Sequence, residues 1–235
     1  MNSINLTPIG RIYSPYKEKF AIPRQPGLVE DGDGYIQLLP PYNQKEAVRG
    51  LEQFSHLWLI FVFHKTAEDG WRPTVRPPRL GGNTRLGVFA TRSTFRPNPI
   101  GLSLVKLKNI RTQGSDIFID LGSIDLVDGT PILDIKPYLP FAESLPDANA
   151  GFAQEAPEVM LTVDFSLAAE TVLHKESTRY PQLKRFITQL LAQDPRPAYQ
   201  KNSHEIRDYA VHLLDFNIRW RVVNSVNYVF AIEYK

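Results

Sequence analysis

Short runs of apolar residues follow one another through the first two-thirds of the chain, and most are rich in β-branched or aromatic side chains. Stretches rich in proline and glycine separate them, such as PRQPG at residues 23–27 and RPNPIG at 96–101. This succession is typical of a β-sandwich or β-barrel rather than of alternating βαβ units. We therefore expect a mainly β fold, with one short helix at 44–54 and strands at 9–13, 35–39, 56–64, 86–91, 102–110, 116–121, 131–138 and 160–165.

The pattern changes after a small-residue, acidic stretch that ends near residue 158. Residues 166–177 and 181–193 predict two helices, because the second carries leucine, isoleucine and phenylalanine at helical spacing. Strands are expected at residues 209–223 and 228–234. The chain thus divides into a β-rich domain at 1–145, a linker at 146–158 and a small α+β appendix at 159–235.

The amino-acid composition limits the kinds of functional site that the protein can have. Hydrophobic residues make up 43% of the 235 residues and charged residues 22%, which is typical of a globular protein. The sequence holds no cysteine, which excludes disulfides, thiolate nucleophiles and Cys-type zinc sites. The five histidines are scattered and no common nucleotide, metalloprotease or serine-hydrolase motif occurs, so no metal site is expected. No secretory signal is visible and the longest apolar run, residues 57–63, is too short to span a membrane, which favours a cytoplasmic protein.

The charges are distributed unevenly. Residues 70–115 hold 9 lysines and arginines and no acid, and six of the nine are arginines between Arg72 and Arg96. Such a segment predicts a positive surface that attracts phosphate or carboxylate groups. The alternative is pairing with residues 116–170, which hold 1 basic residue and 11 acids, as neighbouring strands.

Two proline-rich loops carry unusual polar groups. In PRQPG the prolines fix the backbone around Arg24 and Gln25, so that a guanidinium and an amide face a ligand, although an ordinary surface loop is the alternative. Residues 92–98 supply two arginines, three hydroxyl or amide side chains and Phe95, and prolines flank Asn98. So many hydrogen-bonding groups on a stiff loop favour a functional role.

Two further stretches have plausible structural explanations. His64 and Lys65 follow a buried strand where a barrel would open, and His64 is either a ligand contact or an ordinary structural histidine. In DLVDGTP at 125–131, Asp125 or Asp128 would hold ribose hydroxyls or a cationic group, whereas DGTP alone is a good β-turn.

The segments PRQPG, RGLEQFSHLW, GVFATRSTFRPNPIGLSL and DLVDGTPILDIKPYLP together resemble the TsaA-like or YaeB-like (TrmO) family. These proteins are S-adenosylmethionine-dependent methyltransferases that modify threonylcarbamoyladenosine in tRNA. The resemblance covers residues 5–145, and DPRPAY and DFNIRWRV resemble the C-terminal part of longer members. It implies a small β-barrel domain that binds S-adenosylmethionine, and a homodimer with the cofactor near the subunit interface.

The resemblance also implies a reaction. The methyl group would go to the exocyclic nitrogen of threonylcarbamoyladenosine, next to the anticodon of a threonine tRNA, giving the N6-methyl product. The alternatives are a non-catalytic RNA-binding barrel, or a methyltransferase that acts on another RNA or a small molecule.

The site residues are carried over by motif. The resemblance places cofactor contacts at Pro23, Arg24, Gln25, His64, Lys65, Arg92, Leu102, Asp125, Leu126, Val127 and Asp128. Substrate contacts are expected at Arg96, Asn98, Lys136, Tyr138, Arg196 and Tyr199. For Arg196 and Tyr199, in DPRPAY, a turn that ends the preceding helix is the alternative. A base would help methyl transfer, since the acceptor nitrogen is conjugated to a carbonyl, and His64 and Asp128 are its candidates.

Overall fold

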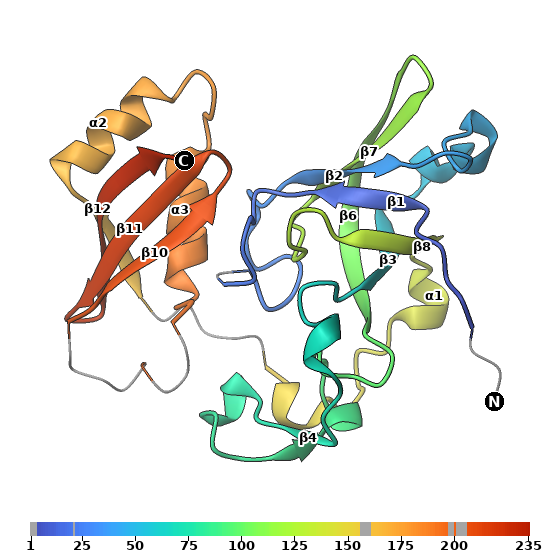
Figure 1. The fold of residues 1–235 in the computed structure, drawn as a ribbon, viewed down its shortest axis with the longest axis horizontal. Helices are drawn as coiled ribbons and strands as arrows, with labels where there is room; N and C mark the ends of the chain where they lie inside the picture. The colour runs from blue at the N-terminus through green and yellow to red at the C-terminus, as the bar shows by residue number, and fades with distance from the viewer. Residues whose placement is uncertain (1–3, 21, 156–160, 197–199, 201–205) are drawn as a thin grey trace.

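The computed structural model describes residues 4–20, 22–155, 161–196, 200 and 206–235. In the first part, six strands join in the order β1-β2-β7-β6-β3-β8, and β8 pairs with β1 to close the sheet into a barrel (Figure 1). These strands are β1 (Gly10–Tyr13), β2 (Gly34–Leu38), β3 (His56–Val62), β6 (Ile100–Gln113), β7 (Asp116–Gly122) and β8 (Pro131–Pro137). The predicted mainly β class is confirmed.

Alternating burial explains why these segments form barrel strands. Every second residue of β3 is buried, so that Leu57, Leu59 and Phe61 face the interior. Ile36 and Ile119 face the same interior and sit directly opposite each other on β2 and β7. Because successive side chains point to opposite faces of a strand, this pattern fixes the register of the closed sheet.

Every pairing in the barrel is antiparallel. The C-terminal ends of β1, β3 and β7 therefore meet the N-terminal ends of β2, β6 and β8 at one rim of the barrel. Four segments that are far apart in the sequence leave the strands at this rim, which we call the barrel mouth: residues 17–33, 63–66, 91–99 and 123–130.

Two sequence predictions in this part are wrong. The expected strand at 86–91 is only β5 (Leu86–Gly87), paired with β4 (Thr74–Val75) and followed by a 3₁₀ turn at Val88–Ala90. The expected helix at 44–54 is two 3₁₀ turns, Lys45–Val48 and Leu51–Gln53. Gly50 lies between these turns with φ 85°, which is incompatible with a continuous right-handed helix.

The second part is a four-stranded sheet in the order β10-β11-β12-β9, with two helices. Its elements are β9 (Thr162–Phe165), α2 (Leu167–Lys175), α3 (Leu183–Ala192), β10 (Asp208–Leu213), β11 (Phe216–Val223) and β12 (Val226–Tyr234). The Ser166 hydroxyl accepts a hydrogen bond from the Ala169 amide at 3.1 Å and begins α2. The single strand predicted at 209–223 is a hairpin, because Leu214 adopts φ 54° and reverses the chain.

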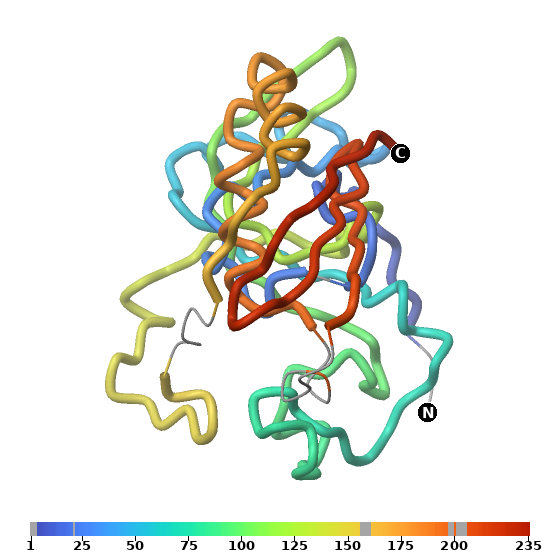
Figure 2. Tube along the Cα trace, turned by 90° about the vertical axis from the view of Figure 1, so that its left-hand side faces the viewer, coloured from blue at the N-terminus to red at the C-terminus, as the bar shows by residue number. Residues whose placement is uncertain are grey.

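Residues 146–155, predicted as linker, follow α1 (Pro140–Glu143) and include a 3₁₀ turn at Gly151–Ala153. Figure 1 and Figure 2 show the C-terminal sheet and α3 lying beside the barrel. The Tyr16 ring packs on Phe186 of α3 with centroids 5.8 Å apart, and Tyr16 also bridges to Leu213 of β10. We propose that the two parts are separate domains with a shared packed interface. Among the described residues, none of the helices is long and apolar enough to cross a membrane.

Candidate functional site

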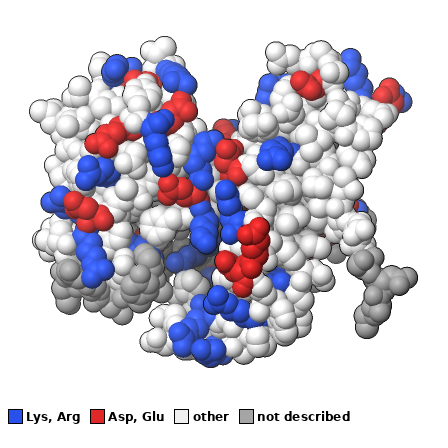
Figure 3. All heavy atoms as spheres, in the orientation of Figure 1, with Lys and Arg blue, Asp and Glu red and all other residues white. Residues whose placement is uncertain are grey.

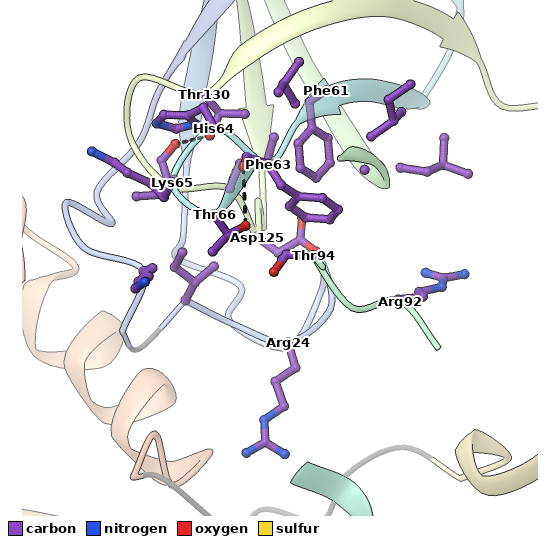
Figure 4. A pocket seen from close by; sticks show the side chains of 18 of the residues that line it. Arg24, Phe61, Phe63, His64, Lys65, Thr66, Arg92, Thr94, Asp125 and Thr130 are labelled. Atoms are coloured by element: carbon purple, nitrogen blue, oxygen red, sulfur yellow. Dashed lines mark hydrogen bonds between the residues drawn. The ribbon is translucent and has the colours of Figure 1, made fainter. Parts of the chain in front are cut away.

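A cavity of about 470 Å³ opens at the barrel mouth, within the size range of small-molecule sites. Figure 4 shows side chains from several loops converging on it. The lining residues are Lys19, Ile22, Pro23, Arg24, Gln25, Phe61, Val62, Phe63, His64, Lys65, Thr66, Thr91, Arg92, Thr94, Arg96, Ile100, Gly101, Leu102, Asp125, Leu126, Val127 and Thr130.

Most of the cofactor contacts expected from the sequence come together here. Ten of the eleven line the cavity, namely Pro23, Arg24, Gln25, His64, Lys65, Arg92, Leu102, Asp125, Leu126 and Val127. They come from the four segments of the barrel mouth and, for Leu102, from β6, so the closed antiparallel barrel is what gathers them. Whether they bind a cofactor stays a prediction at this point.

Asp128 is the exception. It lies outside the lining and forms an ion pair with Lys17 at 2.9 Å. Its other carboxylate oxygen accepts a hydrogen bond from the Ser14 amide at 2.8 Å. The carboxylate therefore fastens the chain after β1 to the turn at 127–130, and both of its oxygens already have partners.

The expected substrate contacts are dispersed. Arg96 lines the cavity, while its guanidinium donates to the carbonyls of Val88 and Thr91 at 3.2 and 2.7 Å. Asn98 is exposed next to the cavity and is not part of its lining.

Lys136 and Tyr138 lie towards the opposite end of the barrel. They follow Thr130 by six and eight residues along β8, which is about 20 Å or more of extended chain. Lys136 pairs with Asp134, and Tyr138 packs edge-on against Trp58. Within one chain, these two residues are not brought together with the cavity.

Arg196 is buried and forms an ion pair with Asp194 at 2.7 Å. The structure thus gives the Arg196 guanidinium a partner inside the C-terminal part and does not present it to an external ligand. Tyr199 lies outside the described residues.

The two proline-rich loops are tied to each other across the mouth. Pro23 is buried and anchors its loop, whereas Arg24 and Gln25 are exposed. Arg92 Nη1 donates to Gln25 Oε1 at 2.9 Å, so this contact joins the loop after β1 to the loop before β6. In Figure 4, Arg24 and Arg92 extend from separate loops at the periphery of the cavity.

Hydroxyl groups hold the loop before β6 in shape. The Ser93 amide donates to Thr91 Oγ1 at 3.2 Å, and the Phe95 amide donates to Ser93 Oγ at 3.3 Å. Thr91 Oγ1 itself donates to the Val88 carbonyl at 2.8 Å. Some of the polar side chains of residues 91–96 are therefore structural, since their hydroxyl groups bind backbone groups of the loop.

The deep part of the cavity combines an aromatic wall with one carboxylate. Phe61 and Phe63 pack edge-to-face with centroids 5.1 Å apart. In Figure 4, Asp125 lies below Phe63 and near Thr94. Its carboxylate accepts a hydrogen bond from Ser103 Oγ at 2.5 Å. Burial raises the pKa of Asp125 to about 6, because desolvation disfavours the charged form more than Ser103 and Arg92 favour it.

His64 is the other titratable group with a changed environment. Burial and the neighbouring Lys65 ammonium lower the pKa of His64, so the ring is neutral near pH 7. Its Nδ1 atom is buried and has no hydrogen-bond partner. A buried polar atom without a partner beside a cavity is suited to a hydrogen bond with a ligand.

Sequence reasoning missed several lining groups. Lys19 and Thr66 carry no motif, and Phe61 reads as a core residue of a buried strand. Ser103 was not predicted either. Buried and exposed residues alternate at the start of β6, which places the Ser103 side chain on the inward face, where it binds Asp125. The signal available for Ser103 was a lone hydroxyl at an interior position of a strand, where a buried polar group needs a partner.

Charge is concentrated around the cavity and below it. The lining holds five cationic side chains, Lys19, Arg24, Lys65, Arg92 and Arg96, besides Asp125. Lysine and arginine side chains also gather on the lower lobe in Figure 3, which carries β4 in Figure 1. We call residues 70–90 the arginine lobe; its four arginines, Arg72, Arg76, Arg79 and Arg85, are all exposed.

The two interpretations of the basic segment now separate. Pairing with acids on a neighbouring strand is confirmed for Arg111, which binds Asp120 with Nε 2.7 Å from the carboxylate. It is wrong for the arginine lobe, whose four guanidinium groups form no ion pair with any residue that the structure describes. Instead, Arg72 stacks on Phe95 at 4.4 Å and Arg79 donates to the Glu155 carbonyl.

Comparison with known proteins covers both parts of the chain. The family model of the tRNA-methyltransferase O N-terminal domain matches residues 11–144, and that of the TrmO C-terminal domain matches residues 158–235. The chain is 62% identical over 233 residues to the tRNA (adenine(37)-N6)-methyltransferase of Escherichia coli, covering 99% of each chain.

Two relatives from Pseudomonas aeruginosa extend the comparison. A protein provisionally named S-adenosylmethionine-dependent methyltransferase RcsF is 50% identical over 217 residues, which are 92% of this chain and 91% of the relative. A crystal structure of TrmO from Pseudomonas aeruginosa superposes with a TM-score of 0.80 and 39% identity, and the match covers 98% of each chain.

Proposed function

This chain belongs to the tRNA-methyltransferase O family, and from that membership we propose that it catalyses methyl transfer from S-adenosylmethionine to N6 of adenosine 37 in tRNA. A relative with this activity in its name, the Escherichia coli protein, matches the chain over 99% of its length. The observation that carries the proposal within this molecule is the cavity at the barrel mouth, where cationic groups surround an aromatic wall and one deep carboxylate.

The side chains in the cavity fit the chemistry of the cofactor. S-adenosylmethionine has a carboxylate, an ammonium, ribose hydroxyls and a flat adenine. Arg24 and Arg92 suit the carboxylate, because guanidinium groups bind carboxylates through paired hydrogen bonds. Leu102 and the aromatic wall suit the adenine, and the unpartnered His64 Nδ1 suits a hydroxyl or an amino group.

When bound, the cofactor supplies a methyl group on a sulfonium, which is transferred by in-line displacement. The residues of the mouth contribute by positioning, since orientation of the two reactants supplies much of the rate in such a reaction. The contact between Arg92 and Gln25 and the hydroxyl network of residues 91–95 hold this part of the mouth in one arrangement.

We propose that the arginine lobe holds the phosphates of the anticodon arm. Four exposed guanidinium groups without acidic partners give a surface suited to a polyanion. Phe95, on which Arg72 already stacks, is placed to stack on an unpaired base of the loop. Adenosine 37 would have to leave its stack to reach the cavity.

We also propose threonylcarbamoyladenosine in threonine tRNA as the acceptor, with its N6-methyl derivative as the product. The threonyl group adds a carboxylate next to N6, and the lining has more cations than the methionine carboxylate of the cofactor requires. Lys65 and Lys19 remain for the threonyl carboxylate after Arg24 and Arg92 are assigned to the cofactor.

A homodimer is proposed as the working form. Leu102, on the outward face of β6, is 51% exposed although it lines the cavity, and Phe89 in the arginine lobe is 75% exposed. A second copy would cover such apolar groups next to the site. Light scattering during size-exclusion chromatography tests this, and a monomer at assay concentration would contradict it.

The function is tested with three tRNA preparations. Threonine tRNA with threonylcarbamoyladenosine and another tRNA that carries the modification are purified from a strain lacking this protein, and the same threonine tRNA without modification is transcribed in vitro. We expect mass spectrometry of digested nucleosides to show one added methyl group on the modified threonine tRNA alone. Methylation of the unmodified transcript would overturn the proposed acceptor. Binding of tRNA without binding of S-adenosylmethionine in calorimetry would favour a non-catalytic RNA-binding barrel.

A further inference from the structure

Asp125 is the only carboxylate among the residues that line the cavity, and among the described residues it has no ion pair. Arg92 lies close enough to affect its charge, yet the Nη1 of Arg92 donates to Gln25 instead. A carboxylate that is partly buried without a cationic partner destabilises the folded protein. Its presence at the bottom of a ligand cavity therefore calls for a chemical reason.

Ser103 fixes the orientation of this carboxylate. Its hydroxyl is on β6, faces the barrel interior, is only 1% exposed and donates to Asp125 Oδ1. The only other hydrogen bond that lowers the pKa of this carboxylate comes from its own backbone amide, and no side chain in the described part of the chain binds Oδ2, so this oxygen has a lone pair available. Figure 4 shows the carboxylate at the centre of the cavity, while the labelled arginines lie further out.

Burial is the largest influence on the proton affinity of Asp125, while Ser103, its own amide and Arg92 lower its pKa. The Asp125 charge in turn contributes to the strongly raised pKa of Tyr16, and the pKa of His64 is lowered. The cations of the lining are Lys19, Arg24, Lys65, Arg92 and Arg96. Desolvation outweighs these influences and brings the pKa of Asp125 to about 6, which leaves it ionised at pH 7 and much more basic than an ordinary aspartate.

We propose that Asp125, oriented by Ser103, is the catalytic base that removes the proton from N6 of the acceptor adenosine during methyl transfer. The N6–H bond breaks and its proton goes to Oδ2 of Asp125. The electron pair on nitrogen forms the new N–CH₃ bond, and the C–S bond breaks with its electrons remaining on sulfur. This inference rests on the proposed function, and Ser103 acts as a positioning residue.

The other candidates fit this role less well. Both carboxylate oxygens of Asp128 are already engaged, one by Lys17 and the other by the Ser14 amide, and Asp128 lies outside the lining. His64 is neutral and its Nδ1 is free, but its lowered pKa makes the ring a weaker base than an ordinary histidine. The acceptor nitrogen is conjugated to a carbonyl and its proton is partly acidic, so a carboxylate of raised pKa suits it.

The test compares Asp125→Asn with Asp147→Asn, an exposed acid outside the site, using modified threonine tRNA in single-turnover reactions. Asparagine keeps the shape and still accepts from Ser103, but it cannot take a proton. We expect the methylation rate of Asp125→Asn to fall by about 100-fold or more, with the Kd for S-adenosylmethionine changed by less than about 3-fold. Asp147→Asn should match the wild type in both measurements.

Ser103→Ala gives a second readout that a merely structural role would not move. Wild-type activity should fall as the pH drops through about 6, because protonated Asp125 cannot act as a base. The hydrogen bond from Ser103 lowers the pKa of Asp125, so its removal should move this limb of the pH–rate profile upward by about one pH unit. The limb should be absent in Asp125→Asn.

A third readout uses the ligand-free protein. The pKa of Asp125 is raised from 3.8 to about 6 on folding, so the contribution of Asp125 to the free energy of unfolding should decline as the pH rises between these values and stay lower above them. Asp125→Asn should therefore melt a few degrees above the wild type at pH 7.5, by roughly 2–6 °C, and lose this advantage at pH 4.

The outcomes separate this inference from the function on which it rests. A wild type that methylates no tRNA would overturn the proposed function. An Asp125→Asn variant that weakens cofactor binding as strongly as it weakens turnover would make Asp125 a cofactor contact instead of a base. A variant with an unchanged rate, or an Asp125 carboxyl that titrates near pH 4 in carbon-13 NMR of the free protein, would overturn the inference.

Discussion

Buried charge is handled in opposite ways in the two parts of the molecule. In the C-terminal part, the buried Arg196 guanidinium is matched by the Asp194 carboxylate at 2.7 Å. At the barrel mouth, the Asp125 carboxylate receives hydrogen bonds only from neutral groups, the Ser103 hydroxyl and its own backbone amide, while Arg92, the cation that influences its pKa, donates to Gln25. Folding alone favours the first arrangement, so the second indicates that the mouth is built for a ligand and the C-terminal sheet for support.

The largest loss of stability is expected from breaking the ion pair between Asp194 and Arg196. Asp194→Asn keeps the size of the side chain and tolerates the backbone angle of φ 48° at this position, but it leaves the Arg196 charge buried without its carboxylate. We expect a loss of about 3 kcal/mol in the free energy of unfolding, measured by urea denaturation.

The matched control is Asp208→Asn, which removes the acid of an exposed ion pair with Arg221 in the C-terminal sheet. Asp208→Asn should lower the free energy of unfolding by less than about 1 kcal/mol. If the two variants were equally stable, the buried pair would not be supporting the C-terminal part, and the contrast with the mouth would disappear.

A smaller effect, and one on binding only, is expected at the mouth. Arg92→Ala removes an exposed guanidinium whose described partner is the Gln25 amide, so the melting temperature should stay within about 3 °C of the wild type. The Kd for S-adenosylmethionine should rise by about 10-fold to 100-fold, since a charged hydrogen bond to the cofactor carboxylate is lost.

Arg49→Ala, in an exposed ion pair with Glu46 away from the cavity, is the control for this substitution. A large drop in melting temperature for Arg92→Ala with unchanged cofactor affinity would make Arg92 a structural residue. It would then resemble Arg196 and not a ligand contact.

The fold was predictable wherever burial alternates along a strand. The expected strands at 116–121 and 131–138 match β7 and β8 to within one residue at each end, and buried and less buried positions alternate along most of β7. The errors occur where backbone angles decide. Gly50 and Leu214 adopt positive φ, which breaks the expected helix in one place and the expected long strand in the other. A leucine at such an angle carries no sequence signal.

The site was predictable where motifs mark it. Arg24, Gln25 and Arg92 were found because prolines and dense polar groups stand out in the sequence, and the structure places them around one cavity. The partners of each polar group were not predictable, because they depend on which strands meet. Asp125 and Asp128 look equivalent in DLVD, yet only the structure shows that Asp128 is bound by Lys17 and that Asp125 lies below the cavity with Ser103.

The C-terminal part also contacts a loop that forms the barrel mouth. The segment at 17–33 carries Pro23, Arg24 and Gln25, and its far end contacts α3. Arg185 of α3 binds the Asp31 carboxylate through two nitrogens, and Gln189 accepts from the Asp31 amide at 3.1 Å. The Asp31 side chain is only 10% exposed whereas that of Arg185 is 56% exposed, so the contact is shielded from solvent on the Asp31 side only. The C-terminal part thus braces a loop that forms one wall of the cavity.

Breaking the contact between Arg185 and Asp31 is expected to give the smallest of these effects. It tests how far the barrel mouth depends on the C-terminal part. Arg185→Ala should raise the Kd for S-adenosylmethionine by about 3-fold to 10-fold, because the loop at 22–25 is less ordered before binding. Arg179→Ala, which breaks an exposed ion pair with Asp215 inside the C-terminal part, is the control and should leave this Kd unchanged. Calorimetry on the ligand-free proteins measures both. An unchanged Kd in Arg185→Ala would mean that the barrel alone shapes the mouth. The C-terminal part would then support the chain without influencing the site, and the contrast between the two regions would be complete.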